Sequence, residues 1–138
     1  MIVLAVDPGT VRCGLATSDP LGILATPIGF LPVGDGSDLA QRIVDKAGEL
    51  EAATIIIGYP LQTDGAEGPR AKAVSRLADQ IRALTDAQVE LVDERYTTIE
   101  ARELLRQAGH SSRKQKARVD SAAAAVLLQS WLDSRGPA

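Results

Sequence analysis

Residues 2–10 read Ile2-Val3-Leu4-Ala5-Val6-Asp7-Pro8-Gly9-Thr10, an apolar run that stops at an acid and a turn. The apolar part has the length and residue types of a buried β-strand. Asp7 would then carry a charge at the tip of that strand, where an ionised carboxylate needs a cation, a metal ion or a phosphate-binding loop to compensate it. Asp7 is therefore a candidate functional residue. The alternative is that Asp7 only shapes the turn, because Asp, Pro and Gly are all common turn residues.

The rest of the N-terminal half predicts two further strands, a helix and a buried strand. The strands are expected at about 13–18 and 23–32, and with the first strand they can pair as a meander. After a glycine-rich break at 34–37, apolar residues recur at helical spacing over 39–50. Residues 54–58 are rich in β-branched side chains, as expected of a central parallel strand that helices cover on both faces.

The C-terminal half alternates loops, helices and a strand. Residues 59–68 form a loop at the end of a strand, where open α/β sheets place their ligands. Pro69 is suited to the first position of a helix, and residues 89–94 form the next strand. A capping box predicts a helix over about 97–108, and the last helix is expected over about 116–134.

Length and composition fit a single globular domain over residues 1–138, with a frayed tail at about 135–138. No apolar run approaches the ~20 residues that a bilayer-spanning helix needs, and the N-terminus lacks a secretion signal. We therefore expect a cytoplasmic protein with no membrane partner. Cys13 is the only cysteine, which excludes an intrachain disulfide and a cysteine-rich metal site. Oxygen atoms would have to bind any metal ion.

Acidic residues stand at three places that this fold can bring together. Asp7 ends the first strand, Asp93 and Glu94 end a later strand, and Asp120 lies near the start of the last helix. In a parallel arrangement the first and fourth strands can be adjacent, with the acidic tips at one edge, and the alanines after Asp120 let its helix approach the sheet. Three carboxylates without a histidine or cysteine cluster suit Mg²⁺ or Mn²⁺. Alternatively, the Asp93-Glu94 pair is a solvated strand end, and Asp120 only complements the positive end of its helix.

The formal charge of −3 conceals a basic block. Between Glu103 and Asp120 there is no acid, and the stretch holds the only histidine, His110, with five basic residues: Arg106, Arg113, Lys114, Lys116 and Arg118. Such a block beside acidic positions suits a phosphate-binding rim around a metal site, although it can also be a solvated loop. Aromatic residues make up 3% of the chain, too few for a stacking platform. Recognition of the shape of a structured nucleic acid is therefore favoured over reading of bases.

Four segments, in this order, resemble the YqgF family, also called RuvX, within the RNase H-like superfamily that includes the RuvC Holliday junction resolvases. The first segment alone is weakly specific, because Asp-x-Gly at a strand end recurs in many phosphate-handling proteins. All four together are strongly specific and span nearly the whole chain. They are residues 6–16, 58–61 with 64–68, 93–98, and 116–120 continuing into Ala122 and Ala123.

The resemblance implies an α/β, RNase H-like fold with a mixed five-stranded sheet flanked by helices, and a metal-dependent endonuclease activity. It places Asp7, Glu94 and Asp120 as the catalytic, metal-binding residues. Asp93 suits this role less than Glu94, since neighbouring strand residues point to opposite faces. The family is associated with maturation of the 5′ end of pre-16S ribosomal RNA, and its members have also been described as Holliday junction resolvases. RuvC-type sites commonly use a fourth acid near the third, and residues 121–125 offer none, which leaves the geometry of a second metal open.

The implied mechanism needs acids that hold metal rather than a side-chain nucleophile. Two Mg²⁺ or Mn²⁺ ions about 4 Å apart can activate a water and stabilise the leaving 3′ oxygen of a phosphodiester. Asp7 would bridge both ions, and Arg12, Arg95, Lys114 and Lys116 are candidates for contacts with substrate phosphates. The expected partner is a structured nucleic acid, either pre-16S rRNA or a four-way DNA junction, and a homodimer is left open.

Two other classes of protein share parts of this pattern. An actin-like or sugar-kinase-like ATPase has the same strand, acid and glycine at its phosphate loop, but it needs a second lobe for which 138 residues are too few. A non-catalytic nucleic-acid-binding module could have the same fold and would differ from a nuclease only in lacking cleavage activity. Replacing Asp7 by Asn separates that module from a nuclease, because only a nuclease has cleavage to lose.

Overall fold

The computed structural model describes residues 1–62, 64–96, 103 and 112–135, with the backbone alone for Tyr96 and residues 112–121. The predicted strands, the helices over 39–50 and from Pro69, and the last helix are confirmed. The helix predicted at 97–108 and most of the predicted frayed tail lie outside the described residues. The elements are β1 (Val3–Asp7), β2 (Arg12–Ser18), β3 (Ala25–Pro32), α1 (Leu39–Leu50), β4 (Thr54–Tyr59), α2 (Pro69–Arg82), β5 (Gln88–Asp93), the 3₁₀ turn η1 (Glu94–Tyr96) and α4 (Ser112–Ser134).

The five strands form one mixed sheet in the order β3-β2-β1-β4-β5. β1, β2 and β3 pair as the expected antiparallel meander, while β4 runs parallel to β1 on one side and to β5 on the other. The carboxyl ends of β1, β4 and β5 therefore share one edge of the sheet. Asp7 and Asp93, the last residues of β1 and β5, reach this edge on either side of β4.

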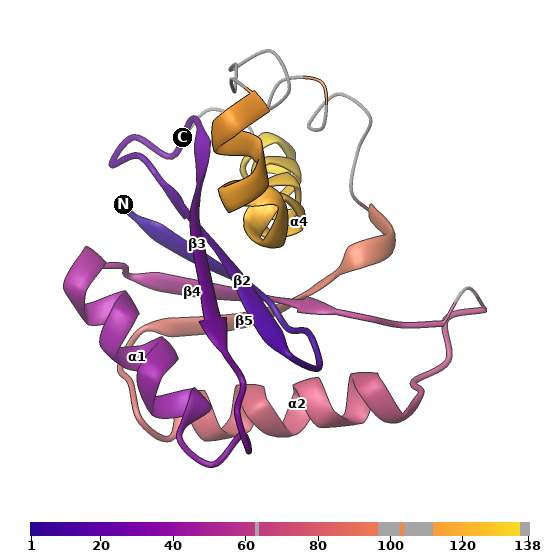
Figure 1. The fold of residues 1–138 in the computed structure, drawn as a ribbon. Coiled ribbons are helices and arrows are strands. Elements are labelled where there is room, and N and C mark those ends of the chain that lie inside the picture. The colour runs from indigo at the N-terminus through magenta and orange to yellow at the C-terminus, as the bar shows by residue number, and fades with distance from the viewer. Residues whose placement is uncertain (63, 97–102, 104–111, 136–138) are drawn as a thin grey trace.

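Helices cover both faces of the sheet, as Figure 1 shows: α1 and α2 lie on one face and α4 lies on the other. Successive side chains of β1 point alternately to these two faces of the sheet. Leu4 and Val6 belong to the hydrophobic core under α1 and α2, whereas Val3 and Ala5 belong to the core under α4. By the same alternation, Asp7 lies on the α4 face, at the edge of the sheet.

The core under α4 is built largely from small residues. Ala5, Ala16 and Ala25 of the sheet meet Ala124 and Ala125 of the helix, and all five are buried. This is the small-residue contact that the alanines after Asp120 predicted. Within the described part of the chain, no helix has the length and hydrophobicity to cross a membrane.

Candidate active site

Asp7 is half-buried at the end of β1, where the chain turns tightly into β2. The turn has no room for a side chain at Gly9, because a Cβ atom there would stand 2.3 Å from the carbonyl oxygen of Arg12. The turn is also held from outside: Nη2 of Arg70, in the first turn of α2, donates a hydrogen bond to the carbonyl oxygen of Pro8 at 2.9 Å. The turn that follows Asp7 is therefore constrained at Gly9 by the backbone of Arg12 and at Pro8 by the side chain of Arg70.

Glu94 is the first residue after β5, and its carboxyl group lies over Gly58 of β4. A Cβ atom built on Gly58 would stand 2.4 Å from Oε1 of Glu94, closer than any side chain can approach. Gly58 is buried between the strand that ends at Asp7 and the strand that ends next to Glu94. The missing side chain therefore creates the space in which the two acids meet.

The pKa of Glu94 reflects the neighbouring carboxyl group of Asp7. Burial raises this pKa, and a hydrogen bond to Asp7 and the negative charge of Asp7 raise it further, to about 7. Arg70 acts in the opposite direction, and Asp93 adds a smaller upward effect. Burial and the neighbouring Asp7 thus favour the protonated form of Glu94, which donates a hydrogen bond to Asp7. The oxygen atoms of these two side chains suit a divalent cation, which would take the place of the proton on Glu94.

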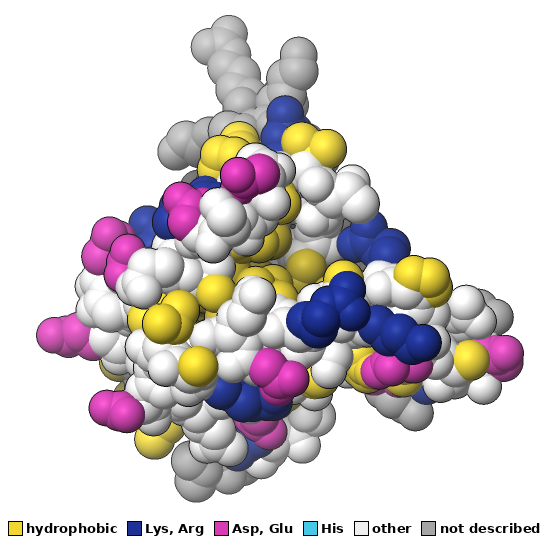
Figure 2. Space-filling model, turned by 90° about the horizontal axis from the view of Figure 1, so that it is seen from below, with side chains coloured by type: hydrophobic (Ala, Val, Ile, Leu, Met, Phe, Trp, Pro, Cys, Tyr) yellow, Lys and Arg dark blue, Asp and Glu magenta, His cyan; other side chains and the backbone are white. Residues whose placement is uncertain are grey.

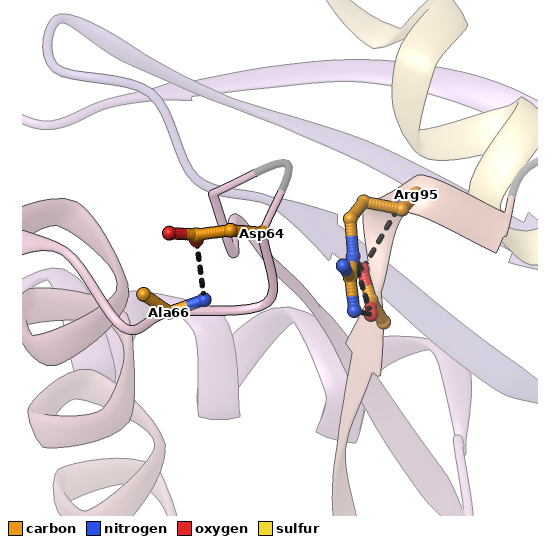
Figure 3. Close-up of polar contacts among 4 residues, drawn as sticks. Asp64, Ala66 and Arg95 are labelled. Atoms are coloured by element: carbon orange, nitrogen blue, oxygen red, sulfur yellow. Dashed lines mark hydrogen bonds and ion pairs between the residues drawn. The ribbon is translucent and has the colours of Figure 1, made fainter.

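Asp93 points away from this pair and is bound to Arg95. Nη2 of Arg95 lies 2.7 Å from Oδ2 of Asp93, and Nε of Arg95 lies 3.1 and 3.0 Å from the two carboxylate oxygens, as Figure 3 shows. The backbone N–H of Arg95 donates to Asp93 as well, at 2.9 Å. The side-chain hydrogen bonds of Arg95 lower the pKa of Asp93. The two neighbouring acids therefore differ: Asp93 is a paired carboxylate, and Glu94 is the partner of Asp7.

The loop after β4 lies beside these residues and is held by hydrogen bonds of its own. The backbone of Gln62 pairs with Ala66 and Gly65, and the carboxylate of Asp64 accepts a bond from the N–H of Ala66 at 2.9 Å, drawn in Figure 3. A Cβ atom on Gly65 would stand 3.7 Å from the Arg95 guanidinium, so the tip of the loop reaches the Asp93–Arg95 pair.

Arg70 is a basic residue beside the two acids that the sequence analysis did not select as a site residue. It bonds to Pro8 and acts on the pKa of Glu94, although 62 residues separate it from Pro8 in the chain. The available signal was its place directly after Pro69, in the first turn of a helix that starts near the acidic edge of the sheet. Its role as a local counter-charge follows only from the tertiary structure.

The other predicted site residues stand as follows. Asp120 lies in α4, four residues before the buried Ala124, and its side chain is outside the described atoms, as are those of Lys114 and Lys116. Arg12, at the start of β2, places its guanidinium 4.9 Å from the centre of the Phe30 ring.

Among the described side chains, no group of three acidic, histidine or cysteine residues could hold a metal ion. The structure thus brings together Asp7 and Glu94 of the three predicted ligands.

The comparisons with known proteins agree with this fold. Residues 1–134 match the family model of RuvX, described as Holliday junction resolvase. Two solved structures share the fold along nearly their whole length. T. thermophilus RuvC in complex with a Holliday junction substrate has a TM-score of 0.64 and 12% identity, covering 99% of this chain and 98% of that one. Fowlpox virus resolvase with Holliday junction DNA has a TM-score of 0.62 and 13% identity, covering 99% of each. The predicted RNase H-like fold is confirmed.

Similar sequences include several proteins that share one name. The Anaeromyxobacter dehalogenans (strain 2CP-C) protein "Putative pre-16S rRNA nuclease" is 43% identical over 140 residues, which cover 99% of this chain and 100% of the relative. Since the family model and this relative both extend over nearly the full chain, the chain belongs to the RuvX family of Holliday junction resolvases, a family of nucleases that hydrolyse phosphodiester bonds.

Proposed function

We propose that this chain is a divalent-metal-dependent endonuclease that cuts structured nucleic acid, and that its substrate is the 5′ end of pre-16S rRNA. The observation that carries the proposal is the pair of carboxyl groups of Asp7 and Glu94, held together over Gly58 at an edge of the sheet. Such a pair is costly unless a cation relieves it, which is what a metal-binding site requires. The name of the full-length relative supports the rRNA substrate.

In this proposal Asp7, Glu94 and Asp120 hold Mg²⁺ or Mn²⁺, with two ions as the expected number. When bound, these ions supply an activated water and stabilise the leaving oxygen of the cut strand. Glu94 must give up its proton as a cation arrives, so its raised pKa couples metal affinity to pH. Arg70 holds the turn after Asp7 and offsets part of the negative charge of the pair.

Contacts with the phosphates of the substrate are proposed for Arg12, Arg95, Lys114 and Lys116. Arg95 is pinned by Asp93 and lies next to the loop tip at Gly65, which gives its guanidinium a fixed direction at the edge of the sheet. A fixed guanidinium loses less conformational entropy when it binds a phosphate. The proposal further places the chain in the cytoplasm as a single domain, with a homodimer as an open alternative.

A Holliday junction is the second candidate substrate, because the matching family model is described as Holliday junction resolvase. Both substrates present clustered backbone phosphates, so the carboxylate pair serves either one. The two differ in the sugar and in the arrangement of helical arms, which a direct comparison of cleavage separates.

The test is cleavage of pre-16S RNA and of a four-way DNA junction, side by side, with Mg²⁺ and with Mn²⁺. We expect cleavage of the RNA near its 5′ end, and its loss in Asp7→Asn, Glu94→Gln and Asp120→Asn with binding retained. Asp86→Asn, an exposed acid in the turn before β5, is the matched control and should cut as the parent does. Cleavage by Asp7→Asn at the parental rate would remove the proposed site, and cleavage of the junction alone would reassign the substrate. Binding of both without cutting would indicate a non-catalytic module.

A further inference from the structure

A hollow of about 590 Å³ lies next to the turn that follows Asp7, on the face of the sheet that α1 and α2 cover, whereas Asp7 itself lies on the α4 face. It is lined by the turn after Asp7, by Cys13 of β2, by the segment from Val33 to Leu39, and by α2. Within the described residues this hollow begins at Pro8, the residue next to Asp7. It therefore adjoins the turn that follows Asp7, around the edge of the sheet from the two acids.

The walls of the hollow combine an apolar floor with a basic side. The buried residues Cys13, Leu39 and Val74 contribute to the floor, and Arg70 and Arg76 of α2 stand at the side. Figure 2 looks onto this face and shows Lys and Arg side chains gathered beside a hollow with hydrophobic atoms at its bottom. Apolar walls with a few polar groups are typical of pockets for small organic ligands, which measure about 300–1,000 Å³.

The charges select among such ligands. Asp35 is the acid among the described lining residues, and its Oδ1 already accepts hydrogen bonds from the N–H and the hydroxyl of Ser37, at 2.9 and 2.7 Å. The two guanidinium groups therefore favour an anion. A free inorganic anion would gain nothing from the apolar floor, whereas a nucleotide presents a flat, largely apolar base together with a phosphate.

We propose that this hollow binds one unpaired nucleotide of the substrate strand, with its base against the apolar floor and a phosphate near Arg70 and Arg76. The inference rests on the proposed function, because it takes the strand cut at Asp7 as the source of the nucleotide. Arg70 connects the two places: it bonds to the carbonyl oxygen of Pro8 and lines the hollow. An arginine plane can also stack on a base that has left its helix, where aromatic side chains are lacking.

The same chemistry would admit a free nucleotide, so the experiment has two arms. In the first, two RNA duplexes of equal charge carry 2-aminopurine, one as a single unpaired nucleotide and one within a base pair. Binding is followed by fluorescence in EDTA, where no metal-dependent cleavage takes place. In the second arm, AMP and UMP are titrated into the ¹⁵N-labelled chain, and amide shifts are recorded by NMR.

The variants fill the hollow or remove a charge from it. Ala73→Phe places a ring in the hollow, since Ala73 lines it, and Arg76→Gln removes a cation without adding bulk. The matched controls are Ala83→Phe and Lys72→Gln, also exposed on the same helix or its end and outside the lining. If Ala73→Phe does not fold, Arg76→Gln still tests the site.

The parent should bind the RNA with the unpaired nucleotide about tenfold more tightly than the paired RNA. Ala73→Phe and Arg76→Gln should remove this preference, and the two controls should keep it. Equal affinity of the parent for both RNAs, with no shifts from AMP or UMP, would overturn the proposal. Mononucleotide binding that Ala73→Phe abolishes, without a preference for the unpaired nucleotide, would overturn the substrate strand as the source. Because no step requires cutting, these outcomes are independent of whether the chain cleaves pre-16S RNA.

Discussion

Gly58 is the residue on which the spacing of the two acids depends. Any side chain there would meet the carboxyl group of Glu94, which lies over the backbone of β4. The group would have to move away from Asp7, since the neighbouring strands leave β4 itself no freedom. Adding a single methyl group at this position therefore tests the spacing of the two acids, because both acids remain in the chain.

We predict that Gly58→Ala lowers the rate of cleavage about 100-fold, the effect expected when a functional group is displaced by about 1 Å. Rates are measured under saturating metal, and circular dichroism checks that the chain is folded. Gly48→Ala in α1 is the control, because a Cβ atom there meets nothing within 4 Å. That control should cut normally and gain about 0.5–1 kcal/mol in stability, as expected for alanine in place of glycine within a helix. A normal rate in Gly58→Ala would contradict the proposed role of Glu94.

Glu94 should also make the stability of the metal-free chain depend on pH. Its pKa is about 7 in the folded chain against an ordinary value of 4.5, so the folded state binds the proton more tightly than the unfolded state does. The contribution is fully present below about pH 4.5 and is lost as the pH rises to about 7. After allowance for solvent screening of a half-buried group, we expect the free energy of unfolding in EDTA to fall by about 1–2 kcal/mol across this range.

Urea unfolding at several pH values measures this fall, and Glu94→Gln should abolish it, because the amide does not titrate. Asp86→Asn should leave the pH dependence as it is. Saturating Mg²⁺ should reverse the trend, since the cation binds the deprotonated pair. A parental profile in Glu94→Gln would show that another group causes the dependence.

Among the elements, α4 is attached to the sheet by a buried polar side chain as well as by its alanines. Gln129 is fully buried: Oε1 accepts a hydrogen bond from the N–H of Ala25, and Nε2 donates to the carbonyl oxygen of Ile23, both at 2.9 Å. Nε2 also donates to Asp133 within the helix, at 3.0 Å. These bonds attach the C-terminal half of α4 to the start of β3, and Asp120 belongs to the N-terminal half of the same helix.

We predict that Gln129→Leu destabilises the chain by about 1–3 kcal/mol, because it leaves buried backbone groups of the β2–β3 connection without partners. Urea unfolding gives the change, with Gln41→Leu, an exposed position on α1, as the control that should shift by less than about 0.5 kcal/mol. If Gln129→Leu also cleaves more slowly under conditions in which it is folded, the attachment of α4 to the sheet contributes to the active site. Unchanged stability would mean that the loop at Ile23 finds other partners.

For the molecule as a whole, a net charge of −3 must be reconciled with a polyanionic substrate. A negative net charge does not attract a polyanionic nucleic acid to the whole surface, so binding depends on local clusters of basic residues. The structure shows one such place, the α2 side of the hollow, and the sequence predicts a second in the basic block between Arg106 and Arg118, which lies outside the described side chains. Because the chain belongs to the RuvX family of nucleases, the alternative of an actin-like or sugar-kinase-like ATPase is set aside.

We predict that Lys114→Ala with Lys116→Ala weakens binding of all structured substrates to a similar extent. Removing one lysine–phosphate interaction should reduce the slope of log affinity against log salt by about one on duplex DNA. Lys46→Ala on α1, away from the acidic edge, should leave the slope unchanged. Weaker binding to one base sequence only would contradict an interaction with phosphates, and an unchanged slope in the double variant would indicate a solvated loop.

Local patterns in the sequence determined most of the elements. The strands from Val3 to Pro32, the buried run of β4 and the start of α2 at Pro69 were all predicted, because side-chain period, β-branching and proline act within a few residues. The four family segments determined the fold class and the nuclease family in the same way, since they are read along the chain.

Only the tertiary structure decided which groups meet. The strand order puts β4 between β1 and β5, so that Asp7 and Glu94 face each other across Gly58, while Asp93 turns to Arg95. It also brought Arg70 to Pro8 and opened a hollow between α2 and the turn after Asp7. The physical reason is that the contacts of Asp7 with Glu94 and of Arg70 with Pro8 join residues tens of positions apart, while even the neighbouring pair of Asp93 and Arg95 depends on side-chain directions that no local pattern contains.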